Sequence, residues 1–421
     1  MTVSTPKVVV TGVGAITPFG VGVPLFWDTL LEGKSAVQET KQNEWQKWIP
    51  VSAQLPEINL QDYLPKKLIK KTDRFTQLSL IATAEAIKDA GLSSASEESW
   101  SVDLPPHRMG ISVGTAYGGV ESLADGASSL TMNPDKRMSP RLLSKSIPNA
   151  AAAAIAMEYT IRGPVMTYTT ACAASANAIG ESMYWLKRGE VDLVLAGGAE
   201  YLFSPVVLSG LRSAGAIATD GPDDKQAWSR PFDVNRKGMV VGEGAAFLVL
   251  ETYEHAVRRG AKIYAELAGY GASNDAYHET APHPDGEGAA IAINRALATS
   301  GLKPNAIDYI NAHATATPVG DKAESIALEK VFTETLASIP VNSIKGAIGH
   351  MLGSAGAIES IACIKSIETG WLPPTLHCTE PDPEAAPPNL VRETTKKAVH
   401  SVLSNSFGFG GQNGSLIWRS I

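Results

Sequence analysis

Residues 167–182 read TYTTACAASANAIGES and place Cys172 between small, β-favouring residues and a stretch with helical periodicity. We therefore expect a strand, a turn and a helix, with Cys172 where the helix begins. The N–H groups and the positive dipole at a helix start would favour the thiolate and make Cys172 a nucleophile. Buried packing is the competing interpretation of a cysteine among alanines.

The composition is that of a globular protein of two or three domains, or of two related halves. The chain has 421 residues, of which 44% are apolar and 19% charged. Its three cysteines are too few for a disulfide framework or a zinc site, so a reducing, cytoplasmic compartment and no metal are expected. Cys363 and Cys378 are interpreted as structural. Neither a signal peptide nor a membrane span is indicated.

Val- and Ile-rich runs alternate with longer helical stretches along the whole chain, which predicts an α/β fold built from βα units. A short internal echo, ANAIGESM at 176–183 and AGAIESIA at 355–362, favours two similar halves that meet at the site. We place the boundary near residue 257, giving an N-terminal half (1–257) with the cysteine and a C-terminal half (258–421).

The net charge of −7 argues against nucleic-acid binding, which needs a basic field. One segment, PKKLIKKTDRF, is locally basic, and its cations would share one face of a helix. A solvated helix face and a docking surface for an acidic protein are both consistent with it. The cations are Lys66, Lys67, Lys70, Lys71 and Arg74.

Two histidines lie in turn-like segments of small residues, His313 in NAHATATPVGDKAE and His350 in SIKGAIGHMLGSAGAIES. Each alone would be read as structural. Together with a cysteine at a helix start, they form the nucleophile and acid/base set needed for acyl transfer followed by carbon–carbon bond formation.

Four ordered blocks now carry a resemblance: TACAAS (170–175), the two histidine blocks, and NSFGFGGQNGSL (405–416). They resemble the signatures of the elongating β-ketoacyl-acyl carrier protein synthases of fatty acid and type II polyketide synthesis. The resemblance spans essentially the whole chain. It implies a thiolase fold, in which duplicated βαβαβαββ halves form five α-β-α-β-α layers, and a dimer.

The resemblance also implies a three-stage Claisen condensation. Cys172 would take an acyl group from the phosphopantetheine of an acyl carrier protein, malonyl-carrier would lose CO2, and the carbanion would extend the chain by two carbons. His313 and His350 would stabilise the enolate oxygen. Backbone N–H groups of Cys172 and of Phe409, which also matches the family's gate, would form the oxyanion hole. No permanently bound cofactor is expected.

Further roles follow from the resemblance alone. Lys345 and Glu324 match a hydrogen-bonded pair beside the histidines, which is equally consistent with a structural ion pair. The pantetheine arm would contact Thr280, Thr315 and Thr317, whereas the acyl and malonyl pockets would be lined by Tyr117, Met239 and Phe407. The basic face, with Arg212, would dock the carrier protein.

Several positions depart from the family pattern, among them Ala314, Ala316, Met239, Gln412 and Tyr117. A tyrosine at the far end of the acyl pocket would reduce its volume. We therefore hypothesise short, unsaturated or polyketide-like chains, with housekeeping fatty acid elongation as the alternative.

Three rival interpretations concern related proteins: a thiolase or CoA-dependent starter synthase, a decarboxylase, and a non-elongating, chain-length-determining partner of a heterodimer. The complete Cys-His-His set weighs against all three. Both a homodimer and a heterodimer with a ketosynthase-like partner remain consistent with the sequence.

Overall fold

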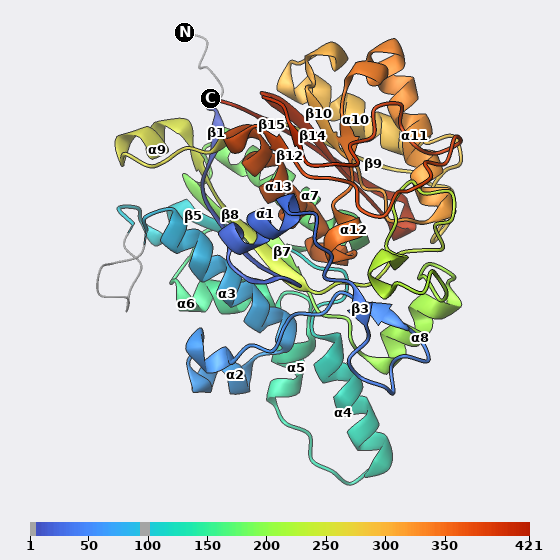
Figure 1. The fold of residues 1–421 in the computed structure, drawn as a ribbon. Helices are drawn as coiled ribbons and strands as arrows, with labels where there is room; N and C mark the ends of the chain where they lie inside the picture. Colours follow the sequence, from blue (N-terminus) through green and yellow to red (C-terminus); the bar gives the residue numbers. More distant parts are fainter. Residues whose placement is uncertain (1–5, 93–101) are drawn as a thin grey trace.

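Each half of the chain forms a mixed sheet of five strands, and the strand order is the same in the two sheets (Figure 1). The computed structural model describes residues 6–92 and 102–421. In each half the spatial order is third, second, fourth, fifth and first strand, and the fifth strand runs antiparallel to both neighbours. The predicted thiolase fold with duplicated halves is confirmed.

The strands of the two sheets are as follows. The N-terminal sheet contains β1 (Val8–Thr17), β5 (Met109–Gly114), β6 (Val165–Tyr168), β7 (Leu193–Glu200) and β8 (Gly244–Thr252). The C-terminal sheet contains β9 (Ala265–Asn274), β10 (Tyr309–Asn311), β11 (Val341–Asn342), β14 (Ser401–Gly408) and β15 (Gln412–Arg419). Antiparallel pairing of Val9 with Glu266 and of Val10 with Ala265 joins the sheets.

Helices separate and cover the sheets to give five layers (Figure 1). In the middle lie α7 (Ala174–Lys187) and α13 (Ala355–Thr369), which contact each other and strands of both sheets. The N-terminal sheet is covered outside by α3 (Arg74–Asp89) and α6 (Ala150–Glu158), and the C-terminal sheet by α10 (Glu287–Ser300) and α11 (Pro318–Phe332). Three apolar clusters fill the spaces between the layers.

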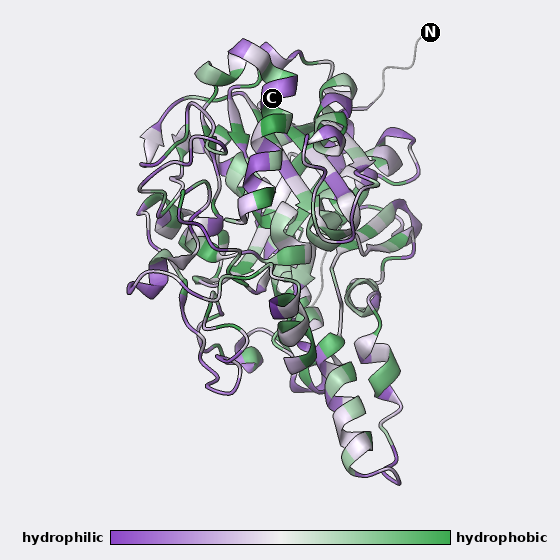
Figure 2. Cartoon of the chain, turned by 90° about the vertical axis from the view of Figure 1, so that its right-hand side faces the viewer, coloured by the Kyte–Doolittle hydropathy of each residue, from purple (hydrophilic) through white to green (hydrophobic). Residues whose placement is uncertain are grey.

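The remaining elements lie around these layers. The helices are α1 (Val23–Leu31), α2 (Lys66–Lys71), α4 (Val120–Met132), α5 (Arg141–Ser146), α8 (Pro205–Ser213), α9 (Tyr253–Arg258) and α12 (Lys345–Ile348). The short strands are β2 (Gly20–Val21), β3 (Gln38–Glu39), β4 (Val51–Ser52), β12 (Trp371–Leu372) and β13 (Thr395–Lys396). Figure 2 shows that the hairpin of α4 and α5 projects from the rest, with apolar and polar residues interleaved.

The internal echo in the sequence corresponds to a repeated local structure. A 3-10 turn precedes each central helix: η3 (Ala171–Ala173) before α7 and η7 (Leu352–Ser354) before α13. Both turns begin with a non-glycine residue in the left-handed region, Ala171 at φ 48° and Leu352 at φ 42°. Such strain persists only where the surrounding structure imposes it.

The boundary predicted near residue 257 falls in α9, which connects the last strand of one sheet to the first strand of the other. It stays a prediction. Within residues 6–92 and 102–421, no helix has both the length and the apolar character needed to cross a bilayer.

Candidate active site

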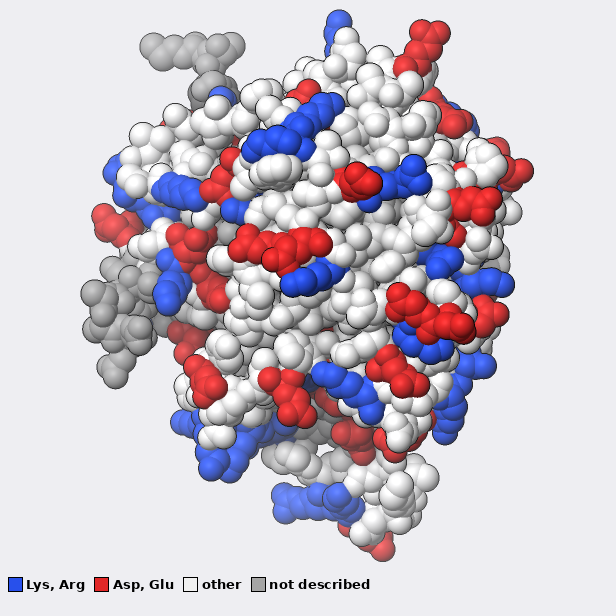
Figure 3. Space-filling view, viewed as in Figure 1, with Lys and Arg blue, Asp and Glu red and all other residues white. Residues whose placement is uncertain are grey.

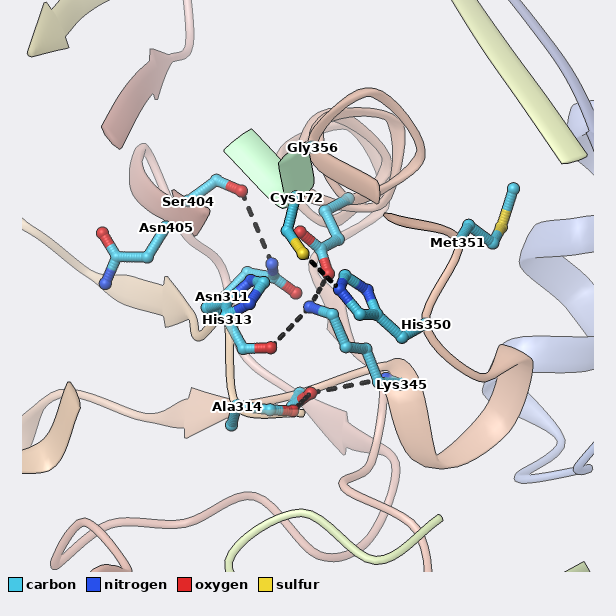
Figure 4. Close-up of polar contacts among 12 residues, drawn as sticks. Cys172, Asn311, His313, Ala314, Lys345, His350, Met351, Gly356, Ser404 and Asn405 are labelled. Atoms are coloured by element: carbon cyan, nitrogen blue, oxygen red, sulfur yellow. Dashed lines mark hydrogen bonds and ion pairs between the residues drawn. The ribbon is translucent and has the colours of Figure 1, made fainter. Parts of the chain in front are cut away.

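Cys172 is the middle residue of η3, directly before α7, so the predicted place at a helix start is correct. Its side chain is 5% exposed. The sulfur lies 2.9 Å from Nε2 of His350, which comes from the other half of the chain (Figure 4). The tertiary structure therefore brings the nucleophile and a histidine 178 residues away into hydrogen-bond contact.

His313 completes the group from the end of β10. Its ring lies edge-on to that of His350, with centroids 5.3 Å apart. Ligand atoms of Cys172, His313 and His350 all lie within 4.8 Å of one another. A thiol and two imidazoles this close could also hold a metal ion, so the prediction of no metal stays a prediction.

Both histidines are uncharged at neutral pH. Burial and the nearby ammonium of Lys345 lower the pKa of His313 and His350 well below the usual range, and His350 itself lowers the pKa of His313 further. Within the described residues, Nδ1 of neither ring has a hydrogen-bond partner. Neither tautomer is therefore fixed from that side, and Nε2 can serve as acceptor or donor.

The predicted thiolate is not what the structure shows. Burial raises the pKa of Cys172 to about 12, and this outweighs the lowering by Lys345 and by the backbone N–H of Phe409, which hydrogen-bonds to the sulfur. Near pH 7 the residue is a thiol, because desolvation of an anion costs more than the helix start provides. Cys172 needs a base, and Nε2 of His350 is in place.

The turn after β14 lies against the nucleophile. A Cβ added at Gly408 would be 2.9 Å from the backbone nitrogen of Cys172 and 3.1 Å from the carbonyl oxygen of Thr170. Only glycine admits this approach. The next residue, Phe409, directs its N–H to the sulfur. The main chains of Cys172 and Phe409 thus meet beside Sγ, where an oxyanion hole requires its donors.

Lys345 is paired with a different glutamate from the one predicted. Its ammonium donates to Glu359, on α13, and to the carbonyl oxygen of His313 (Figure 4). Glu324 instead accepts hydrogen bonds from the N–H groups of His313 (2.9 Å) and Ala314 (2.7 Å). Glu324 thus holds the segment that carries His313 directly, and Glu359 holds it through Lys345. The expected Lys345–Glu324 hydrogen bond is therefore wrong.

A cavity of about 380 Å³ reaches the three reactive residues. Its lining includes the predicted Thr280, Thr315, Thr317, Met239 and Phe407, together with Phe409. The hydroxyls of Thr315 and Thr317 lie 3.0 Å apart, on either side of Ala316 at φ 66°. A lining that combines threonine hydroxyls with apolar side chains suits an amide-containing arm that ends in an acyl group.

Tyr117 does not line this cavity. Its side chain is 47% exposed, in the middle of the loop between β5 and α4. The side chains packed behind Phe409 are instead an apolar cluster that includes Phe203, Leu352 and Met239. The placement of Tyr117 in the acyl pocket is therefore not reproduced in the single chain, and Gln412 likewise lies outside the lining.

The basic residues do not form one helix face as predicted. Four lysines are exposed on α2, namely Lys66, Lys67, Lys70 and Lys71, and the helix ends at Lys71 because Thr72 is extended (ψ 156°). Arg74 begins the separate helix α3 and lies half-buried in a cavity with Glu243. Arg212 is exposed on α8, away from α2, and donates to the carbonyl oxygens of Lys47 and Trp48. Figure 3 shows the lysines of α2 at the lower left.

Two residues that support the site were not predicted from the sequence. Glu359 stands in the echo AGAIESIA, but helical periodicity alone gave no reason to pair it with Lys345. Arg236 holds the threonine segment, because its guanidinium donates to the carbonyl oxygens of Thr317 (3.3 Å) and Pro318 (2.9 Å). Its Arg-Lys-Gly context could have suggested only an exposed turn.

The two cysteines interpreted as structural are placed accordingly. Cys363 and Cys378 are buried, and neither lines the cavity. His278 is exposed and accepts the N–H of Thr280 through Nδ1 (3.1 Å).

Comparison with known proteins identifies relatives of both halves of the chain. The family profile described as "Beta-ketoacyl synthase, N-terminal domain" matches residues 5–256, and "Beta-ketoacyl synthase, C-terminal domain" matches residues 264–379. The 3-oxoacyl-[acyl-carrier-protein] synthase, mitochondrial, of Arabidopsis thaliana is 39% identical over 439 residues, which cover 99% of this chain and 93% of that protein.

Two solved structures have the same fold. One is a chain of "AntDE:AntF (apo): type II PKS acyl-carrier protein in complex with its ketosynthase bound to the hexaketide", with a TM-score of 0.88, 31% identity, and 99% and 100% of the two chains covered. The other is "The ishigamide ketosynthase/chain length factor", with a TM-score of 0.89, 32% identity and the same coverage. The chain belongs to the β-ketoacyl synthase family of decarboxylating acyltransferases.

Proposed function

We propose that the chain is a 3-oxoacyl-[acyl-carrier-protein] synthase, which transfers an acyl group to Cys172 and condenses it with a decarboxylated malonyl unit. The observation that carries this proposal is the 2.9 Å contact between Sγ of Cys172 and Nε2 of His350, with His313 beside it in one cavity. A thiol nucleophile, a base and a second neutral imidazole are what the two chemical steps require.

Acylation begins at the thiol. Nε2 of His350 accepts the proton of Cys172 as the sulfur attacks the thioester carbonyl of the acyl-carrier. The new C–S bond forms, the pantetheine C–S bond breaks, and the departing sulfur takes the proton from His350. The N–H groups of Cys172 and Phe409 stabilise the oxyanion between these events.

Condensation uses both histidines as donors. The bond between the malonyl α-carbon and its carboxylate breaks, CO2 leaves, and the electron pair forms an enolate. Nε2–H groups of His313 and His350 hydrogen-bond its oxygen, which neutral rings can do without protonating the carbon. The enolate carbon then attacks the acyl-cysteine, the new C–C bond forms as the C–S bond to Cys172 breaks, and the departing thiolate takes up a proton from solvent.

The acyl carrier protein docks on basic surface near α2. Lys70 lines a second cavity, of about 400 Å³, between α2, α4 and α5. Its lining contains a single acidic residue, Asp125, and further cations, namely Lys136, Arg137, Arg141 and Lys145. Such a concentration of positive charge would attract an acidic partner. Arg212 would act separately, on α8, two residues before Ala214, which lines the cavity that contains Cys172.

Two copies of the chain would form the working dimer through the free edge of the N-terminal sheet. β6 is the last strand in the sheet order, and Met166 on it is 51% exposed. Met157, on the neighbouring α6, is 77% exposed. An exposed edge strand with apolar side chains is a pairing site for another chain. Light scattering of wild type and Met166→Lys tests this, because a dimeric variant would contradict it.

The acyl chain is proposed to be short, unsaturated or polyketide-like. Support comes from the packed apolar cluster behind Phe409, which confines an acyl chain to the 380 Å³ cavity.

The predicted cytoplasmic location is part of the same proposal, and cell fractionation tests it.

The decisive experiment offers the purified protein a panel of acyl-carrier proteins of increasing chain length, without malonyl-carrier, and follows its intact mass. A thioester adduct is expected on wild type and not on Cys172→Ala, and it should be strongest for short chains. Equal labelling by long saturated chains would contradict the proposed substrate. A folded wild type without any adduct would favour the second candidate, a non-elongating subunit that works with a partner ketosynthase.

A further inference from the structure

A buried carboxylate beside the catalytic residues has no part in the reaction steps above. Glu200 is the last residue of β7 and is fully buried. Its oxygens accept four hydrogen bonds from two segments far apart in the sequence. The donors are Oγ1 of Thr115 (3.1 Å) and the N–H groups of Ala116 (2.5 Å), Tyr117 (3.3 Å) and Gly353 (3.1 Å).

These donors belong to different halves of the molecule. Three come from the loop after β5, in the N-terminal half, and the fourth comes from η7, three residues after His350. Glu200 therefore ties the turn that follows His350 to the half that carries Cys172. Because four donors surround two oxygens, the carboxylate has a fixed position.

The approach of η7 to Glu200 leaves no space for a side chain at position 353. A Cβ on Gly353 would lie 2.4 Å from Oε2 of Glu200 and 2.4 Å from the backbone nitrogen of Ala116. Any larger residue would separate the two segments. Gly353 thus provides an independent way to disturb this contact without changing a charge.

The charge of Glu200 also acts on the nucleophile. Burial raises the pKa of Cys172 most. Lys345 and the N–H of Phe409 lower this pKa, and the next contributions, from Glu200 and Glu359, raise it. Burial raises the pKa of Glu200 itself to about 7, against the lowering by its four donors. Glu200 is therefore an anion under the mildly alkaline conditions of a thiol assay.

We propose that Glu200 is a positioning residue with two separable effects. Its hydrogen bonds hold His350 at the sulfur of Cys172, and its negative charge disfavours the thiolate form of Cys172. The thiol then keeps its proton until His350 removes it for a bound thioester. This inference rests on the proposed role of Cys172 as nucleophile.

Two variants of Glu200 separate the effects. Glu200→Gln removes the charge and keeps the size of the side chain, whereas Glu200→Asp keeps the charge and shortens the reach. The rate of Cys172 alkylation by iodoacetamide is followed by intact mass from pH 7 to 10.5, together with kcat and KM. Glu200→Gln should alkylate faster than wild type at pH 8.5, because removing the charge of Glu200 lowers the pKa of Cys172. Glu200→Asp should alkylate like wild type but lose about tenfold or more in kcat at unchanged KM.

Two further variants complete the experiment: Gly353→Ala is a second test of the positioning effect, and Glu251→Gln is the control for removal of a buried carboxylate. Gly353→Ala should resemble Glu200→Asp, with lower kcat and a wild-type alkylation rate. Glu251 is equally buried at the opposite end of the β7–β8 pair, so Glu251→Gln should lose stability without faster alkylation.

The outcomes distinguish this inference from the proposed function. Wild-type alkylation of Glu200→Gln, or unchanged kcat in both Glu200→Asp and Gly353→Ala, would overturn it. A wild type that forms no acyl adduct on Cys172 overturns the proposed function instead, because alkylation requires no acyl transfer. If Glu200→Gln does not fold, the kcat of the other two variants still decides the positioning effect.

Discussion

Cys172 and Gly353 occupy equivalent positions in the two halves of the chain. Each is the middle residue of a 3-10 turn that begins in the left-handed region and leads into a central helix. The thiol of Cys172 lines the cavity, whereas Glu200 occupies the space that a side chain at position 353 would need. The duplicated fold thus provides two similar turns facing each other, of which one carries the nucleophile and the other supports His350.

Gly408→Ala should reduce turnover strongly, because a Cβ there would collide with the backbone nitrogen of Cys172 at 2.9 Å. Displacing one oxyanion donor costs on the order of 10²–10³ in kcat. We expect such a loss with little change in KM for the acyl-carrier, measured by steady-state kinetics. Gly210→Ala, where a Cβ would meet nothing within 4 Å, should behave like wild type. Equal kinetics of the two variants would refute the assignment.

Lys345→Met should destabilise the fold and abolish condensation. It would leave Glu359 buried without its cation, and breaking such a pair costs about 3–5 kcal/mol. Chemical denaturation measures the free energy of unfolding. The exposed pair of Lys322 and Glu384 is the control, since Lys322→Met should cost less than about 1 kcal/mol. Similar losses in both variants would contradict the role of burial.

Decarboxylation should tolerate mild acid. Because the pKa values of His313 and His350 lie well below the usual range, both rings stay neutral as the pH falls through that range. CO2 release from malonyl-carrier by Cys172→Ala should therefore change less than about twofold between pH 8 and 6. A loss centred near pH 6.5 would show that one of the rings titrates normally.

Glu251 should contribute stability that depends on pH. Burial raises its pKa, but hydrogen bonds from His255, Arg259 and Thr11 outweigh burial and lower it overall. The unfolded chain then binds the proton more readily, so the contribution is present above the usual glutamate pKa and disappears as the pH falls through the lower folded value. The difference in Tm between wild type and Glu251→Gln should shrink below about pH 4. A constant difference down to pH 3 would contradict this.

Reversing charge on α2 should weaken recognition of the carrier and leave the chemistry intact. Lys67→Glu combined with Lys70→Glu should raise KM for acyl-carrier about tenfold or more at low salt, with less effect at high salt. KM for acyl-pantetheine, which lacks the protein, should not change. Lys262→Glu, at an exposed site beside Glu368, controls for net charge. A parallel increase for both substrates would place the defect in the cavity.

Much of the fold and the reactive set could be predicted from the sequence. Alternation of β-branched runs with helical stretches indicated the βα units. The similarity of residues 176–183 to residues 355–362 indicated the duplication. The blocks around Cys172, His313 and His350 indicated acyl-transfer chemistry, because a thiol at a helix start and two imidazoles together supply a nucleophile and an acid/base set. These properties depend on local spacing and residue type, which a sequence shows directly.

Other features were decided only by the tertiary structure. Lys345 pairs with Glu359 and not with Glu324 because α12 and α13 pack at the site, and no spacing rule specifies which of two buried glutamates a lysine meets. The thiol form of Cys172 follows from its burial, which outweighs the helix start. Glu200 gained a role because two loops far apart in the sequence converge on it. Partners and solvation depend on side-chain directions between distant segments, and these are fixed only when the layers pack together.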